Sequence, residues 1–340
     1  MFTSPHPVTF DQLTEEDVAF DENFLNSVAY WDVEPAGCLP TPSPEGSPQA
    51  QFGHSQAFPT LPTAPVYSVS TAFTKDAYYG GAVPDTVIAS ADHVHFYVSR
   101  TLLARISTNG FGGLLPALEH SLDGLPLSRT SDTAEILNLI LHAAHDMCPD
   151  RFTPSLPTLV AALDRVPAYG LSPAHYAVRG RAFYNALVTR APLAPLTVYA
   201  AAARRELDEI AVAVSPHLLS MQLSRITDED AEAMGPVYLK RFFLLHQRRI
   251  DALKDILAQA PYPHTELPDC NFAEQRKIVR AWQLTAAYLV SESRPDLPAS
   301  TIESTVNALA AGVPCDGCRE VLQKRSRKAV VEWTMLQRTI

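Results

Sequence analysis

The chain has 340 residues, 46% of them hydrophobic, which is enough to build the cores of one or two domains. No run of about 18 apolar residues occurs, so no membrane-spanning helix is predicted, and the first residues lack the basic and apolar regions of a secretory signal. The net charge is −10, and apart from one basic run at 319–328 Lys and Arg are not clustered, which argues against nucleic acid as a general partner.

Residues 1–80 carry most of this charge, because ten acidic residues there face one basic residue, a balance of −9. Residues 35–65 are rich in Pro, Ser, Thr, Gly and Gln, which bury too little apolar surface to offset conformational entropy. We therefore predict that 1–80 is a disordered acidic arm. Within it, residues 10–31 mix acidic and hydrophobic side chains. They are predicted either to bind a partner's groove as an amphipathic helix or to fold back on their own domain.

A strand pattern begins at residue 84. Residues 84–98 are predicted to form two strands joined by a turn at Ala91-Asp92. In the second strand apolar and polar side chains alternate, so His93 and His95 share one face. We expect both imidazoles to face solvent.

Helical periodicity dominates the rest of the chain. The first group of helices is expected over 101–106, 131–146, 156–163 and 172–187. The second group is expected over 195–214, from the capping box at Thr227 onward, and over 276–289 and 301–309. Phe242, Leu245 and Arg249 would share one helical face, which favours a buried apolar stripe with Arg at its rim. The basic run 319–328 is expected to be a solvated helix face.

The order of these segments resembles the BTB/POZ family. Asp85-Thr86-Val87-Ile88 stands at the first strand, and Phe96-Tyr97-Val98-Ser99-Arg100-Thr101-Leu102-Leu103 matches the second strand and the helix that follows. Ser107 and Phe111 match the next two family positions, and residues 131–145 and 156–171 resemble the family's later helices. The helices after residue 190 are similar to the C-terminal extension of fungal, mushroom-type BTB proteins.

This resemblance implies an α+β fold: a BTB/POZ-like domain at 82–190 with a small sheet and helices, followed by an all-helical extension at 191–340. It implies a non-enzymatic protein–protein interaction module, a scaffold or adaptor that forms a homodimer and recruits a further protein partner. The implied interaction surface contains Leu102, Leu103, Phe111, Leu114 and Leu115. Ser99 replaces the family's usual histidine. No hydrophobic-x-Glu element convincingly follows Phe111, so a cullin-adaptor role is not supported.

Cys315-Asp316-Gly317-Cys318 is the sharpest chemical motif. Such a pair can supply two thiolates to a zinc ion, and Cys270 or His264 could complete a tetrahedral set. A second Cys-x-x-Cys or a His pair at ligand spacing is missing, so we expect structural thiols and no metal. A zinc-binding regulator using Cys270, Cys315 and Cys318, and a redox pair, remain the alternatives.

Other chemistry is weaker in this sequence. His142 and His145 lie one helical turn apart, but no Glu accompanies them as in metalloenzymes. No nucleophile motif or phosphate-binding glycine loop occurs. We therefore expect no enzyme activity and no cofactor. Five scattered cysteines without a signal favour reduced thiols and an intracellular location, in the cytoplasm or nucleus. A transcriptional cofactor that acts through residues 10–31 is a second alternative function.

Overall fold

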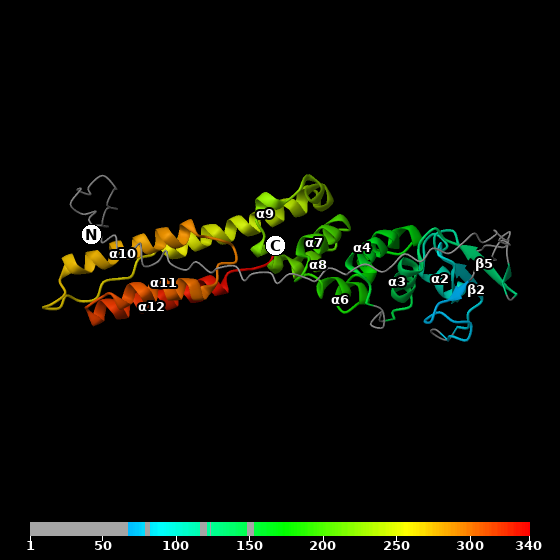
Figure 1. Cartoon of the computed structure of the whole chain (residues 1–340), viewed down its shortest axis with the longest axis horizontal. Helices are drawn as coiled ribbons and strands as arrows, with labels where there is room; N and C mark the ends of the chain where they lie inside the picture. The colour runs from blue at the N-terminus through cyan, green and yellow to red at the C-terminus, as the bar shows by residue number, and fades with distance from the viewer. Residues whose placement is uncertain (1–66, 79–81, 116–120, 123, 148–152) are drawn as a thin grey trace, which may run out of the picture. The chain divides into compact units, whose positions relative to one another are not determined.

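A computed structural model describes residues 67–78, 82–115, 121–122, 124–147 and 153–340 (Figure 1). The predicted arm therefore lies outside the described residues up to residue 66, and so do residues 10–31. The described chain combines one small mixed sheet with many helices, which confirms the α+β class. Among the described residues, no helix is both long enough and apolar enough to cross a membrane.

The centre of the sheet is β2 (Thr86–Ala89), whose four residues are all buried. It pairs antiparallel with β3 (Val94–Val98) through the predicted turn and parallel with β5 (Leu125–Arg129). Two short edge strands complete the order β1-β3-β2-β5-β4. These are β1 (Ser68–Val69) and β4 (Ser121–Leu122). Parallel pairing needs a crossover, and α2 (Arg100–Ile106) lies within it.

The sheet corrects two predictions. Residues 67–78 were placed in the disordered arm, but β1 pairs with β3, and Phe73 is fully buried with its ring 6.0 Å from that of Phe96. His95 was expected in solvent but is only 4% exposed. Tyr67 stacks on the His95 ring at 4.8 Å, so the added edge strand covers a face that alternation alone assigns to water. His93 is exposed, as expected.

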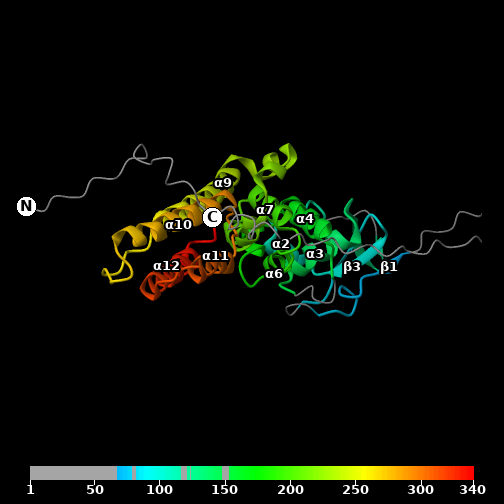
Figure 2. The ribbon, with the colours of Figure 1, turned by 60° about the vertical axis from the view of Figure 1, so that its left-hand side comes forward.

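The next helices pack against the sheet in one core, and Figure 2 shows α3 and α4 beside the strands. They are α3 (Ala134–Ala144), α4 (Leu156–Arg165), η3 (Val166–Tyr169), α5 (Pro173–Tyr176) and α6 (Ala182–Val188). The predicted burial of α3 is confirmed, because every residue from Leu137 to Ala144 is buried. The single helix predicted over 172–187 is wrong: the chain breaks between α5 and α6, where Gly180 has φ +87°.

A second series of helices follows to the end of the chain. They are α7 (Pro195–Arg204), α8 (Asp208–Val214), η4 (Ser215–Ser220), η5 (Leu223–Arg225), α9 (Asp228–Ala258), α10 (Phe272–Ser291), α11 (Ala299–Ala311) and α12 (Asp316–Met335). The predicted Thr227 capping box is confirmed. The helix predicted over 195–214 is two helices, because Glu206 adopts φ +55° between them. Arg325 is only 6% exposed, so the basic run 319–328 is not entirely a solvated face.

Three groups of buried side chains hold these elements together. The largest extends from Phe73 to Phe242, so it crosses the predicted boundary at 190/191, which itself stays a prediction. Two smaller groups lie between α9, α10, α11 and α12. One contains Cys270, Trp282 and Leu322. The other contains Leu253, Leu289 and Trp333. The C-terminal helices therefore depend on modest cores, where a further cross-link has a large effect.

Candidate metal centre

The first half of the centre comes from the connection between α9 and α10. His264 lies in this connection, which ends in a tight turn where Leu267 and Cys270 exchange two backbone hydrogen bonds of 3.1 and 3.0 Å. Asn271 then caps α10 by accepting a hydrogen bond from the Glu274 amide. The turn and the cap together fix the Cys270 side chain at the start of α10.

The second half is the Cys-x-x-Cys motif at the start of α12. Cys315 is the N-cap residue, and its carbonyl accepts the Arg319 amide at 3.0 Å. Cys318 lies three residues further on, and residues at this spacing share one side of a helix. Helix geometry therefore points both thiols to the same side.

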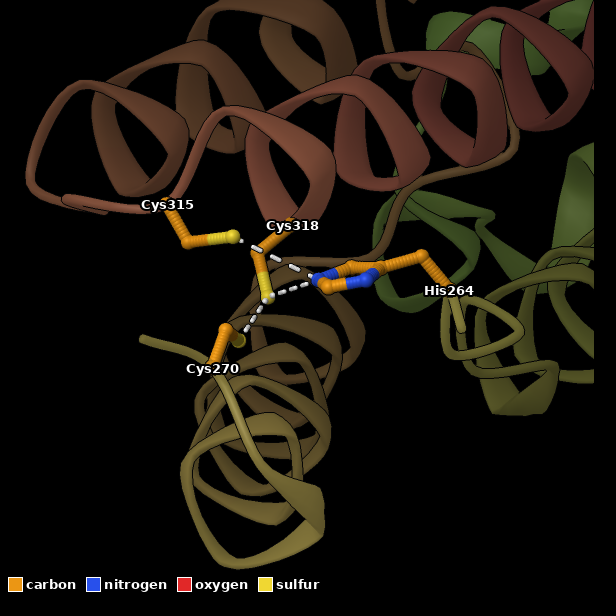
Figure 3. Close-up of side chains that lie close together, drawn as sticks. All are labelled: His264, Cys270, Cys315 and Cys318. Atoms are coloured by element: carbon orange, nitrogen blue, oxygen red, sulfur yellow. Dashed lines mark hydrogen bonds between the residues drawn. The ribbon is translucent and has the colours of Figure 1, made fainter. Parts of the chain in front are cut away.

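All four side chains converge (Figure 3). His264 Nε2 lies 3.3 Å from Cys318 Sγ and 3.4 Å from Cys315 Sγ, and the sulfurs of Cys270 and Cys318 are 3.5 Å apart. The four ligand atoms all lie within 4.8 Å of one another. A tetrahedral zinc site has edges of about 3.8 Å between sulfurs and about 3.5 Å between sulfur and nitrogen, since Zn–S is about 2.3 Å and Zn–N about 2.0 Å. The three separations given above lie within about 0.3 Å of these edges, and the other separations, none above 4.8 Å, are short enough for the four side chains to close around one zinc ion.

The surroundings prepare the imidazole for metal binding. His264 Nδ1 lies 2.6 Å from the Thr265 carbonyl oxygen, which can only accept a hydrogen bond. The proton therefore belongs on Nδ1, and the lone pair of Nε2 points at the thiols. The buried Gln275 amide donates to the Cys270 carbonyl at 3.4 Å, which links the turn to α10. Such outer contacts orient metal ligands.

The thiols differ in their acidity. Burial raises the pKa of Cys318 to about 12 and also raises the pKa of Cys270, since both side chains are only 2% exposed. The Cys318 backbone N–H lowers the pKa of Cys315 to about 7. A cation that binds here must displace the protons of the two buried thiols, as is usual for thiolate metal sites.

Gly317 leaves the space that the imidazole occupies. A Cβ atom at this position would lie 3.0 Å from His264 Cδ2 and 3.1 Å from Cγ and Nε2. These separations are shorter than ordinary carbon contacts of about 3.5 Å. His264 can therefore approach the start of α12 this closely because residue 317 has no side chain.

The other residues singled out in the sequence lie elsewhere. Leu103 and Phe111 are fully buried in the large core and Leu115 is 9% exposed, so assigning these three to an interaction surface was wrong. They form the packing beneath α2 and the turn after it. Leu102 and Leu114 keep partial exposure.

His142 on α3 and His145, the C-cap residue of that helix, both contact the buried Phe73 ring. His142 is 3% exposed, and its Nδ1 lies 2.8 Å from the Asn138 carbonyl oxygen, which fixes the proton on Nδ1. Neither His142 nor His145 belongs to a group of metal-ligating side chains within the described part of the chain.

Comparison of the chain with models of protein families, with curated proteins and with solved structures finds no match.

Proposed function

We propose that this is a non-enzymatic protein whose C-terminal helices are organised by one structural Zn²⁺ ion bound by His264, Cys270, Cys315 and Cys318. The observation that carries the proposal is the convergence of four ligand atoms from two separate segments to within 4.8 Å. Three thiolates and one imidazole are the donor set of structural zinc sites. Soft sulfur donors disfavour magnesium and calcium, which bind oxygen.

The donor set also favours a structural role over catalysis. Catalytic zinc sites keep one coordination position for water, with three protein ligands, whereas structural sites use four. Here four side chains supply all four positions, and two of the thiols are almost completely buried. An ion in this centre would have no free position for a substrate.

The ion would act as a cross-link between distant segments. Cys270 and Cys318 are 48 residues apart in the chain. They also belong to the same small core as Trp282 and Leu322. An ion that binds only the folded form stabilises that form by mass action. Structural zinc can supply much of the folding free energy of a small unit.

Metal analysis tests this proposal. The full chain is purified without chelator and measured by elemental mass spectrometry, with an expected content near one zinc per chain. Cys318→Ser should reduce the content below one fifth. Cys38→Ser is the control for loss of a thiol and should keep one equivalent. A wild-type chain that holds no zinc, even after reconstitution under reducing conditions, would reject the centre.

A second candidate function concerns the sheet domain. We propose that it is a BTB-like module that self-associates, supported by the β2–β3 hairpin that leads directly into α2 and by the parallel pairing of β5 with β2. Leu102 on α2 keeps partial exposure for a partner. Light scattering should give a dimer for the full chain and a monomer for Leu102→Asp. Leu193→Asp, at a side chain 91% exposed, should leave the dimer intact. A monomeric wild-type chain contradicts this candidate.

A further inference from the structure

A groove outside the metal centre lies beside α9, and several arginines line it. It has a volume of about 280 Å³ and lies between α9 and the segment that follows α12. The helix lines it with Arg241, Leu244, Leu245, Arg248 and Arg249, and residues 336–340 form much of the opposite wall. These five helix residues recur at spacings of three and four, so they form one continuous stripe. Three guanidinium groups thus line one groove.

Arg249 is the buried member of this stripe, at 5% exposure. Its Nε donates to the Pro295 carbonyl at 2.6 Å, and Nη1 donates to the Leu336 and Gln337 carbonyls at 3.2 Å each. Its guanidinium lies 4.2 Å from the centre of the Trp333 ring. These carbonyl oxygens accept hydrogen bonds from Nε and Nη1 but do not cancel the charge.

The acidic side chains around the groove neutralise only part of the positive charge of these arginines. Arg241 is paired with Asp208 at 2.7 Å, and Asp208 also accepts the Tyr238 hydroxyl. Asp296 is close enough to Arg249 to interact with its charge, and it forms an ion pair of 3.7 Å with Arg294.

Arg248 is exposed. Among the described residues, neither Arg248 nor Arg249 has a carboxylate within ion-pair distance. Arg338 adds a further positive charge near Arg249. The side chains that line the groove therefore carry a net positive charge, from three arginines and, within the described part of the chain, no Asp or Glu.

Apolar side chains stand beside these charges. Leu244 is 36% exposed in the groove, and Val237, one turn before Arg241 on the same side of the helix, is 62% exposed. A matching ligand must bring carboxylates for the guanidinium groups and apolar side chains for this surface. We propose that the groove binds an acidic peptide segment with apolar side chains among its carboxylates. This inference does not depend on the metal centre.

The probe is a fluorescent peptide with the sequence of residues 10–31, which has this chemistry. Anisotropy titrations at low salt use full-length chains whose own acidic residues in that segment are changed to amides, so that the chain cannot supply the ligand. These residues are Asp11, Glu15, Glu16, Asp17, Asp21 and Glu22. Saturable binding is expected, and it should be lost when the peptide carries the same amides.

Two charge reversals locate the site. Arg248→Glu should weaken binding about tenfold, because it replaces an attraction with a repulsion. Arg276→Glu, at an exposed arginine on α10 outside the groove, makes the same change in net charge and should leave the affinity unchanged. Circular dichroism confirms that both variants fold. Absence of saturable binding, equal weakening by both reversals, or displacement of the peptide by a lower concentration of single-stranded oligonucleotide would overturn the proposal.

Discussion

Gly317→Ala should affect the metal-bound state of the protein and the metal-free state differently. The new Cβ would lie 3.0–3.1 Å from three ring atoms of His264, whose Nδ1 is held by the Thr265 carbonyl. An ordinary contact needs about 3.5 Å or more, so the ring must retreat by roughly 0.5 Å. Metal–ligand distances tolerate only about 0.2 Å.

The magnitude of the effect follows from this displacement. Disturbing a ligand's orientation costs about tenfold to one hundredfold in metal affinity, or about 1.4–2.7 kcal/mol. In the metal-free chain the imidazole can turn away, and alanine is favoured over glycine inside a helix by up to about 1 kcal/mol. We therefore expect Gly317→Ala to weaken zinc binding while leaving the metal-free stability equal or higher.

The assay is competition for zinc against a chromogenic chelator, with urea unfolding of the metal-free protein measured in parallel. Gly312→Ala is the matched control, because the atom nearest to its new Cβ is the Leu309 carbonyl oxygen at 3.7 Å. This control should bind zinc as the wild type does. Zinc affinity in Gly317→Ala equal to that of the wild type would refute the argument, since His264 would then not be a constrained ligand.

Three further predictions concern stability in the larger core. Burial lowers the pKa of His145 to about 4, so the unfolded chain takes up a proton below pH 6.5 that the folded chain accepts only near pH 4. The contribution of neutral His145 to the unfolding free energy should be complete above pH 6.5 and fall by roughly 2–3 kcal/mol as the pH drops toward 4. Urea unfolding at pH 7 and pH 5 measures this loss, which should be smaller in His145→Gln. Leu103→Ala should cost about 2–5 kcal/mol of unfolding free energy, because Leu103 is fully buried, whereas Leu193→Ala should cost almost nothing in the same measurement. Tyr169→Phe should cost about 1.5–3 kcal/mol, because its hydroxyl donates at 2.6 Å to Asp132; thermal melts that match the wild type would contradict this.

Features that depend on neighbouring residues could be predicted before the structure was known. The Thr227 capping box, the hairpin turn at Ala91-Asp92 and the buried α3 were all predicted, because caps, turns and helical periodicity are set within a few residues. Helical periodicity does not reveal single residues with left-handed backbone conformation. The helices predicted over 172–187 and 195–214 are therefore each interrupted, at Gly180 and at Glu206.

Tertiary structure decided what distant residues do together. His95 is buried where the two-residue strand β1 pairs beside it and the Tyr67 ring stacks on it, and a strand that short has no periodicity to recognise. The sequence named Cys315 and Cys318 and offered His264 or Cys270 as alternatives, but it favoured thiols without a metal. Whether all four meet depends on how the connection before α10 packs against the start of α12, across 54 residues between His264 and Cys318. That convergence depends on how the helices pack, because no local sequence pattern specifies that the connection before α10 meets the start of α12.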